Sequence, residues 1–110
     1  MPRRTTPDAL ALAIGRRIRA LREEAGLTQE KLAFESELRS KGHLSNLEAG
    51  LVMPTVATLR VVADRLGVLV ADLVTDPKEG DRAKLIELTR GLAPGVLRKL
   101  VRELSASKKK

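Results

Sequence analysis

Histidine and acidic side chains are the candidates for catalytic or metal-binding chemistry in this sequence. His43 is the only histidine among 110 residues, and there is no cysteine, so a thiolate zinc site is excluded. One histidine without a nearby pair of carboxylates assembles neither a metal site nor a catalytic triad. The acids at 23 and 24, and those at 35 and 37, do not converge on one point, because helical side chains three or four residues apart share a face. We therefore expect no enzyme activity, no metal and no cofactor.

Two short segments carry strong signals for helices. They read Gly-Leu-Thr-Gln-Glu-Lys-Leu-Ala at residues 26–33 and Leu-Ser-Asn-Leu-Glu-Ala-Gly at residues 44–50, with a proline at 54. Thr28 can cap a helix over about 29–37, and Ser40 can cap a second over about 41–49. Gly50 ends the second helix because glycine tolerates the left-handed conformation. The pattern predicts two short helices joined by a turn, the unit that seats one helix in the major groove of DNA.

These two segments resemble the phage repressor and Cro family, the lambda-repressor-like, XRE-type helix-turn-helix regulators. The similarity runs from about Ile14 to Val74. It implies an all-α fold with a five-helix domain. It also implies that the second helix of the pair presents its N-terminal residues to base edges of double-stranded DNA.

The resemblance assigns DNA-binding roles to residues at the start of the first helix and on the outward side of the second. They are Gln29, Arg39, Ser40, Lys41, His43 and Asn46. Lys41 could donate to guanine O6 and N7, and Asn46 could form a bidentate pair with adenine. Gln29 occupies the family's phosphate-anchoring position. The alternative is that these are ordinary solvated side chains.

Arg22 and Glu48 match a family pair that ties the first helix of the domain to the end of the recognition helix. Such an ion pair would fix that helix rather than contact DNA. If the pair is buried, removing one partner should lower the free energy of unfolding strongly, because the other charge is left without a partner.

Two stretches depart from the common family pattern. The turn between the two helices is one residue longer, with Glu37 where glycine is usual and Arg39 as the extra residue. The loop at 51–53 reads Leu-Val-Met, whereas many relatives have Lys or Arg there. Phosphate contacts from this loop would therefore come from backbone N–H groups, or the loop meets a protein partner instead.

The net charge of +7 favours a polyanionic partner. Basic residues outnumber acids by six to three in residues 1–26 and by ten to four in residues 77–110, but acids outnumber bases by seven to five in residues 27–76. Charge that neutralises phosphates must then come mainly from the two ends of the chain. Phe34 is the only aromatic residue, which argues against single-strand binding by base stacking.

The chain divides by pattern into four parts. A basic arm spans 1–7, the helix-turn-helix domain 8–75, a helical extension 76–104 and a basic tail 105–110. In the domain, Asp8 caps a first helix and Thr55 a fourth, and a short fifth helix covers 70–74. The apolar stripes are Leu10, Ile14, Ile18, Leu21 and Ala25 on the first helix, and Leu59, Val62, Ala63 and Leu66 on the fourth.

The sequence of the extension predicts a hairpin of two amphipathic helices. Asp76 can cap its first helix with Pro77 at the first helical position and Glu79 in a capping box. The stripes are Leu85, Leu88, Thr89 and Leu92, then Val96, Leu97, Leu100, Val101 and Leu104, separated by a Gly/Pro break. Such a hairpin has more apolar surface than it can bury by itself, so we expect it to mediate dimerisation. The competing use is packing onto the first and fifth helices of the same chain, which would leave a monomer.

Together these patterns favour a sequence-specific DNA-binding transcriptional regulator that binds a pseudo-palindromic operator as a homodimer. The alternative is a protein-interaction module, such as an antitoxin-like or adaptor protein, whose helical extension captures a partner. No segment approaches the length needed to span a membrane. The expected location is the cytoplasm, in association with the nucleoid.

Overall fold

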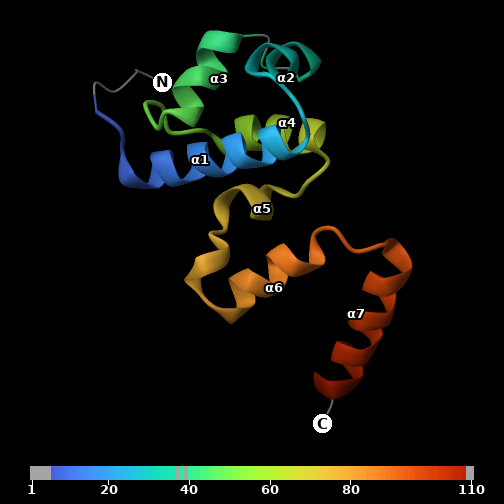
Figure 1. Ribbon diagram of the computed structural model, residues 1–110. Coiled ribbons are helices and arrows are strands. Elements are labelled where there is room, and N and C mark those ends of the chain that lie inside the picture. Colours follow the sequence, from blue (N-terminus) through green and yellow to red (C-terminus); the bar gives the residue numbers. More distant parts are fainter. Residues whose placement is uncertain (1–5, 37, 39, 109–110) are drawn as a thin grey trace. The chain divides into compact units, whose positions relative to one another are not determined.

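The computed structural model describes residues 6–36, 38 and 40–108, and this part of the chain contains helices and no strand. Figure 1 shows the helices in order. The expected all-α class is confirmed. The chain separates into two compact units that meet between Asp76 and Pro77. The first holds α1 (Ala9–Glu24), α2 (Gln29–Glu35), α3 (Lys41–Glu48), α4 (Val56–Leu66) and α5 (Val70–Val74), and the second holds a 3-10 turn η1 (Pro77–Glu79), α6 (Asp81–Thr89) and α7 (Pro94–Lys108).

Side-chain caps begin four helices of the first unit at the expected residues. Each cap accepts a hydrogen bond of 3.0 to 3.1 Å from the backbone N–H three residues later, and the four are Asp8, Thr28, Ser40 and Thr55. These bonds satisfy N–H groups that have no partner inside the helix. Two helices end earlier than expected, α2 at Glu35 and α3 at Glu48.

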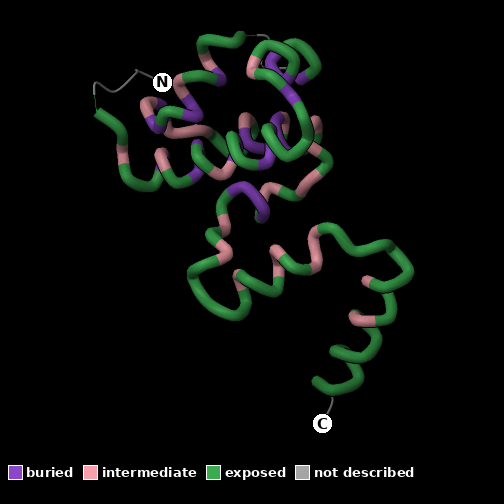
Figure 2. Tube along the Cα trace, in the orientation of Figure 1, coloured by how far each residue is buried: buried purple, intermediate pink, exposed green. Residues whose placement is uncertain are grey.

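The core of the first unit lies among α1, α2, α3, α4 and α5. Figure 2 shows buried residues on all five helices. The cluster is formed by Ile14, Ile18, Leu21, Leu27, Leu32, Ala33, Leu44, Leu59, Val62, Ala63 and Leu73. Leu66 packs against it at the edge. The helix-turn-helix pair is therefore held on a scaffold of three further helices.

The stripe expected on α1 is wrong at both ends. Leu10 is 59% exposed, and Ala11 is buried in its place. The next residue of α1 is in close contact with the end of the α3 segment, because a Cβ at Gly50 would lie 2.6 Å from the Leu12 Cα. Ala25 is exposed because α1 has already ended at Glu24.

The apolar loop after α3 turns inward. Val52 is buried, and Leu51 and Met53 are half-buried. The central side chain of this loop thus packs within its own unit, and the two beside it stay partly accessible.

The second unit begins differently from the expectation. Residues 77–79 form a single 3-10 turn rather than the start of a helix. Gly80 follows with a φ of +150°, a conformation that L side chains rarely adopt, and α6 begins only at Asp81. No residue of α6 or α7, both of which the structure describes throughout, is buried.

Candidate nucleic-acid interface

Helix α3 presents one polar side outward and buries the other. Leu44, Leu47 and Glu48 face the interior. Lys41, Gly42 and Ser45 are exposed, the capping Ser40 is exposed just before them, and His43 and Asn46 are half-buried. Sequence reasoning named Ser40, Lys41, His43 and Asn46 but not Ser45, which is also exposed on this side. Its position four residues after Lys41, on the same helical face, was the available signal.

The position of α3 is set by a close backbone contact with α1. A Cβ at Gly15 would lie 2.2 Å from the Leu47 carbonyl oxygen and 2.7 Å from that of Glu48. Only a residue without a side chain allows α1 to reach the last turn of α3 at this distance. The contact therefore fixes α3 against the longest helix of the unit.

A buried ion pair joins the same two helices. The Arg22 Nε donates to Glu48 Oε2 at 2.7 Å, and its Nη2 donates to Glu48 Oε1 at 3.0 Å. A further Arg22 nitrogen, Nη1, donates to the Leu27 carbonyl at 2.7 Å. The hydrogen bonds that Arg22 donates to Glu48 raise the pKa of Arg22 above its ordinary value despite the opposing effect of burial. Arg22 thus stays charged, and its two bonds to Glu48 fix the geometry of the pair, as bidentate arginine and carboxylate groups favour.

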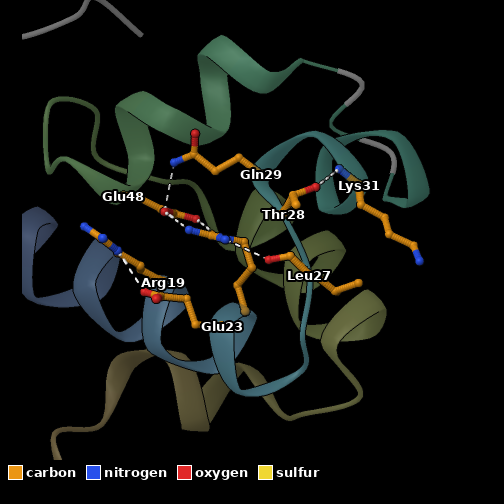
Figure 3. A network of polar contacts seen from close by, with 8 residues as sticks. Arg19, Glu23, Leu27, Thr28, Gln29, Lys31 and Glu48 are labelled. Carbon is orange, nitrogen blue, oxygen red and sulfur yellow. Dashed lines mark hydrogen bonds and ion pairs between the residues drawn. The ribbon is translucent and has the colours of Figure 1, made fainter.

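Gln29 extends this network to α2. Its Nε2 donates to Glu48 Oε1 at 3.0 Å, and Figure 3 shows the amide nitrogen turned toward Glu48 and the amide oxygen turned away. An ionised carboxylate only accepts hydrogen bonds, so the NH₂ end of the amide must face it. Because an NH₂ group has two hydrogens, the second remains able to donate to an anion.

Lys41 lies in a second ion pair, with Glu30. The Lys41 Nζ is 3.1 Å from Glu30 Oε1, which links the first turns of α2 and α3. Both residues line a hollow together with Arg22, Thr28 and Gln29. Two of the six expected DNA-binding residues, Gln29 and Lys41, therefore line the same hollow. Arg39 lies outside the described residues.

The described residues hold no group of three or more His, Cys, Asp or Glu side chains arranged for a metal ion. Within the same residues, no helix combines the length and the apolar character that crossing a membrane requires.

The part of the chain that matches a known family is the part that contains the α2 and α3 helices. A family model described as a helix-turn-helix domain matches residues 13–75, which include the whole α2 and α3 pair and the Arg22–Glu48 link between α1 and α3. The chain belongs to the helix-turn-helix domain family. The resemblance to repressor-like regulators is thereby confirmed.

Two relatives carry names that describe regulation. The chain is 44% identical over 66 residues to an uncharacterized HTH-type transcriptional regulator, y4dJ, of Sinorhizobium fredii, covering 60% of this chain and 84% of the relative. It is 38% identical over 63 residues to an immunity repressor protein of Bacillus phage phi105, covering 57% of this chain and 43% of the repressor. The chain thus spans less than half of the phage repressor's length.

One solved structure matches a larger share of this chain than either of these two relatives does. A chain of a SinR protein/SinI protein complex has a TM-score of 0.61 and 29% sequence identity, and the match covers 88% of this chain and 99% of that one. Because 88% of 110 residues exceeds the first unit, the similarity includes part of the second unit.

Proposed function

We propose that this helix-turn-helix protein is a sequence-specific, double-stranded DNA-binding transcriptional regulator that reads base edges with α3. The observation that carries the proposal is the polar side of α3, where Lys41, Gly42 and Ser45 are exposed while the opposite side is fixed to α1. A helix held in this way can enter the major groove, where lysine recognises guanine and asparagine recognises adenine. The names of the two relatives support the same class of function. A regulator of this kind works in the cytoplasm, at the nucleoid.

Gln29 has the role of a phosphate contact in this proposal. Its amide is held by Glu48 on one side and retains a hydrogen for an anion on the other. Contacts to phosphate fix the register of a protein on the duplex and carry no sequence information. Gln29 would thus position α3, whereas Lys41 and Asn46 would discriminate between sequences.

A homodimer is the form that we propose for operator binding. The exposed apolar faces of α6 and α7 supply surface that a second copy can cover. A two-fold assembly also places two recognition helices about 34 Å apart, one turn of DNA, and such a pair reads a pseudo-palindrome.

Two substitutions test the assignment of roles. Lys41→Ala should cost about 1 to 3 kcal/mol at one base pair of a duplex selected by the wild-type chain, and it should relax the preference at that position. Gln29→Ala should weaken binding to all duplexes alike. An unchanged sequence preference in Lys41→Ala, measured by binding to all single-base variants of the selected duplex, contradicts the assignment of Lys41.

The second candidate function is capture of a protein partner by the second unit. It is favoured by the absence of buried residues in α6 and α7, and a similar chain was solved in a complex with another protein. Sedimentation of the full chain at tens of micromolar separates the two candidates. A dimer supports the homodimeric regulator, and a monomer supports partner capture.

A further inference from the structure

The ion pair between Glu30 and Lys41 places an acidic side chain on a surface expected to face a polyanion. Glu30 lies next to Gln29 in the sequence and contacts Lys41 across the α2–α3 hollow. Glu30 therefore pairs with the proposed base contact and lines the same hollow as the proposed phosphate contact. A negative charge at this place opposes the neutralisation of phosphates that drives general DNA affinity.

Stability of the fold does not account for this pair. The side chains of Lys41 and Glu30 are 55% and 65% exposed, and ion pairs in such surroundings contribute little to the free energy of unfolding. By contrast, the acid that anchors α3, Glu48, is buried with its arginine. The ion pairs that Glu48 and Lys41 form thus differ in kind, and the exposed one is available for recognition.

Lys41 could contact DNA at a base edge or at a backbone phosphate, and Glu30 affects these two contacts in opposite ways. A lysine ammonium has three N–H donors, so it can keep one on Glu30 and use the others on guanine O6 and N7. A phosphate bound by the same ammonium would approach the Glu30 carboxylate, and the two negative charges repel each other. The pair is compatible with contact to a base and unfavourable to contact with the DNA backbone.

We propose that Glu30 is a specificity-determining residue of the α3 interface: it positions the Lys41 ammonium for a base edge and opposes its use as a general phosphate contact. This inference rests on the proposed DNA-binding function. Its consequence is a larger ratio between affinity for the operator and affinity for other DNA, and that ratio decides how a regulator finds its site among competing sequences.

The test compares Glu30→Gln with Asp64→Asn in the full-length chain. Asp64 pairs with Arg60 at 3.0 Å on α4, and the side chains are 65% and 73% exposed, so this control removes the same charge from an equally exposed ion pair. Each protein is titrated with a duplex selected from a random library by the wild-type chain and with a scrambled duplex of equal length and composition, over a series of salt concentrations.

Glu30→Gln should tighten binding to the scrambled duplex about threefold to fivefold. The slope of log affinity against log salt concentration should also become steeper, by about the amount that one additional phosphate contact gives. Binding to the selected duplex should change less than about twofold, so the ratio between the two falls. Asp64→Asn should leave the ratio unchanged. In a Lys41→Met background, Glu30→Gln should have a smaller effect on the scrambled duplex, because the ammonium that it releases is absent.

Equal tightening on both duplexes by Glu30→Gln, or the same fall in the ratio with Asp64→Asn, would overturn the inference and reduce Glu30 to one charge among many. An undiminished effect in the Lys41→Met background would also overturn it. A wild-type chain that prefers no duplex contradicts the proposed function itself, and this inference with it.

Discussion

The two units of the chain treat their apolar side chains in opposite ways. In the first unit, Leu32, Leu44 and Val62 are completely buried. In the second, leucine and valine recur at helical spacing, yet Leu88, Val101 and others stay 36% to 63% exposed. Burial of one such side chain contributes about 1.5 to 3 kcal/mol, so the first unit has an internal source of stability that the second lacks. This contrast is what we expect of helices that bury their apolar side chains by association, as in the homodimer that we propose.

The largest effect that we expect comes from breaking the ion pair at the centre of the first unit. Arg22→Ala or Glu48→Ala should lower the free energy of unfolding by about 3 to 5 kcal/mol, because each leaves a buried charge without its partner. Chemical denaturation followed by circular dichroism measures this. Arg19→Ala removes an exposed pair with Glu23 and should cost less than about 1 kcal/mol. Equal denaturation midpoints for Arg22→Ala and Arg19→Ala would contradict the account.

The pH dependence of this pair follows from Arg22. Its pKa is raised in the folded state, so the stabilisation from this group is fully present below the pKa of the unfolded chain and is lost only as the pH rises through the folded value. Both lie in the strongly alkaline range. The stability difference between wild type and Arg22→Ala should thus stay constant when denaturation is repeated across neutral pH.

Matched leucine substitutions compare the two units directly. Leu73→Ala removes a side chain that is 1% exposed, and it should cost about 2 to 5 kcal/mol. Leu104→Ala alters a side chain that is 59% exposed, and it should change unfolding of the first unit by less than about 0.5 kcal/mol. The same Leu104→Ala chain should self-associate more weakly in sedimentation. A large loss of first-unit stability in Leu104→Ala would remove the contrast between the units.

Two glycines on helices provide the next comparison. Gly15→Ala places a methyl group against the Leu47 carbonyl oxygen and should cost about 1 to 3 kcal/mol as α1 and α3 separate. Gly95→Ala on α7 meets nothing closer than 4.0 Å and should stabilise its helix by up to about 1 kcal/mol. Thermal unfolding of both variants decides this, and equal shifts in the same direction would show that α3 does not depend on the contact with Gly15.

The smallest expected change in stability comes from removing the second unit. A chain that ends at Thr75 should keep its helices and unfold within about 0.5 kcal/mol of the first unit in the full chain, because it retains the whole core. It should sediment as a monomer and lose most of its affinity for the operator. If the shortened chain is unfolded by circular dichroism, the first unit is not self-sufficient.

Local features of the fold could be predicted from the sequence. Asp8, Thr28, Ser40 and Thr55 cap their helices as expected because capping depends on one side chain and the backbone three residues away. Leu10 was wrongly placed inside, since its burial depends on where another segment crosses α1. The expected helix start at Pro77 failed because Gly80, with its φ of +150°, separates that turn from α6.

The contacts of the candidate interface could not be predicted in the same way. The bond from Gln29 to Glu48 spans 19 residues, and the pair of Lys41 and Glu30 spans 11. Residue types suggested what Gln29 and Lys41 could donate to, but helix packing decides which acids lie beside them. The family pattern supplied the positions and named Arg22 and Glu48 as a pair, but only the folded arrangement supplied the partners of Gln29 and Lys41.

Selection of duplexes from a random library by the full-length chain tests the central claim most directly. The account predicts an enriched motif with two-fold symmetry and half-site centres about one helical turn apart. Repeating the selection with Lys41→Ala should change the preference at one symmetric pair of positions. Recovery of no enriched sequence at salt concentrations that retain binding would contradict sequence-specific recognition by α3.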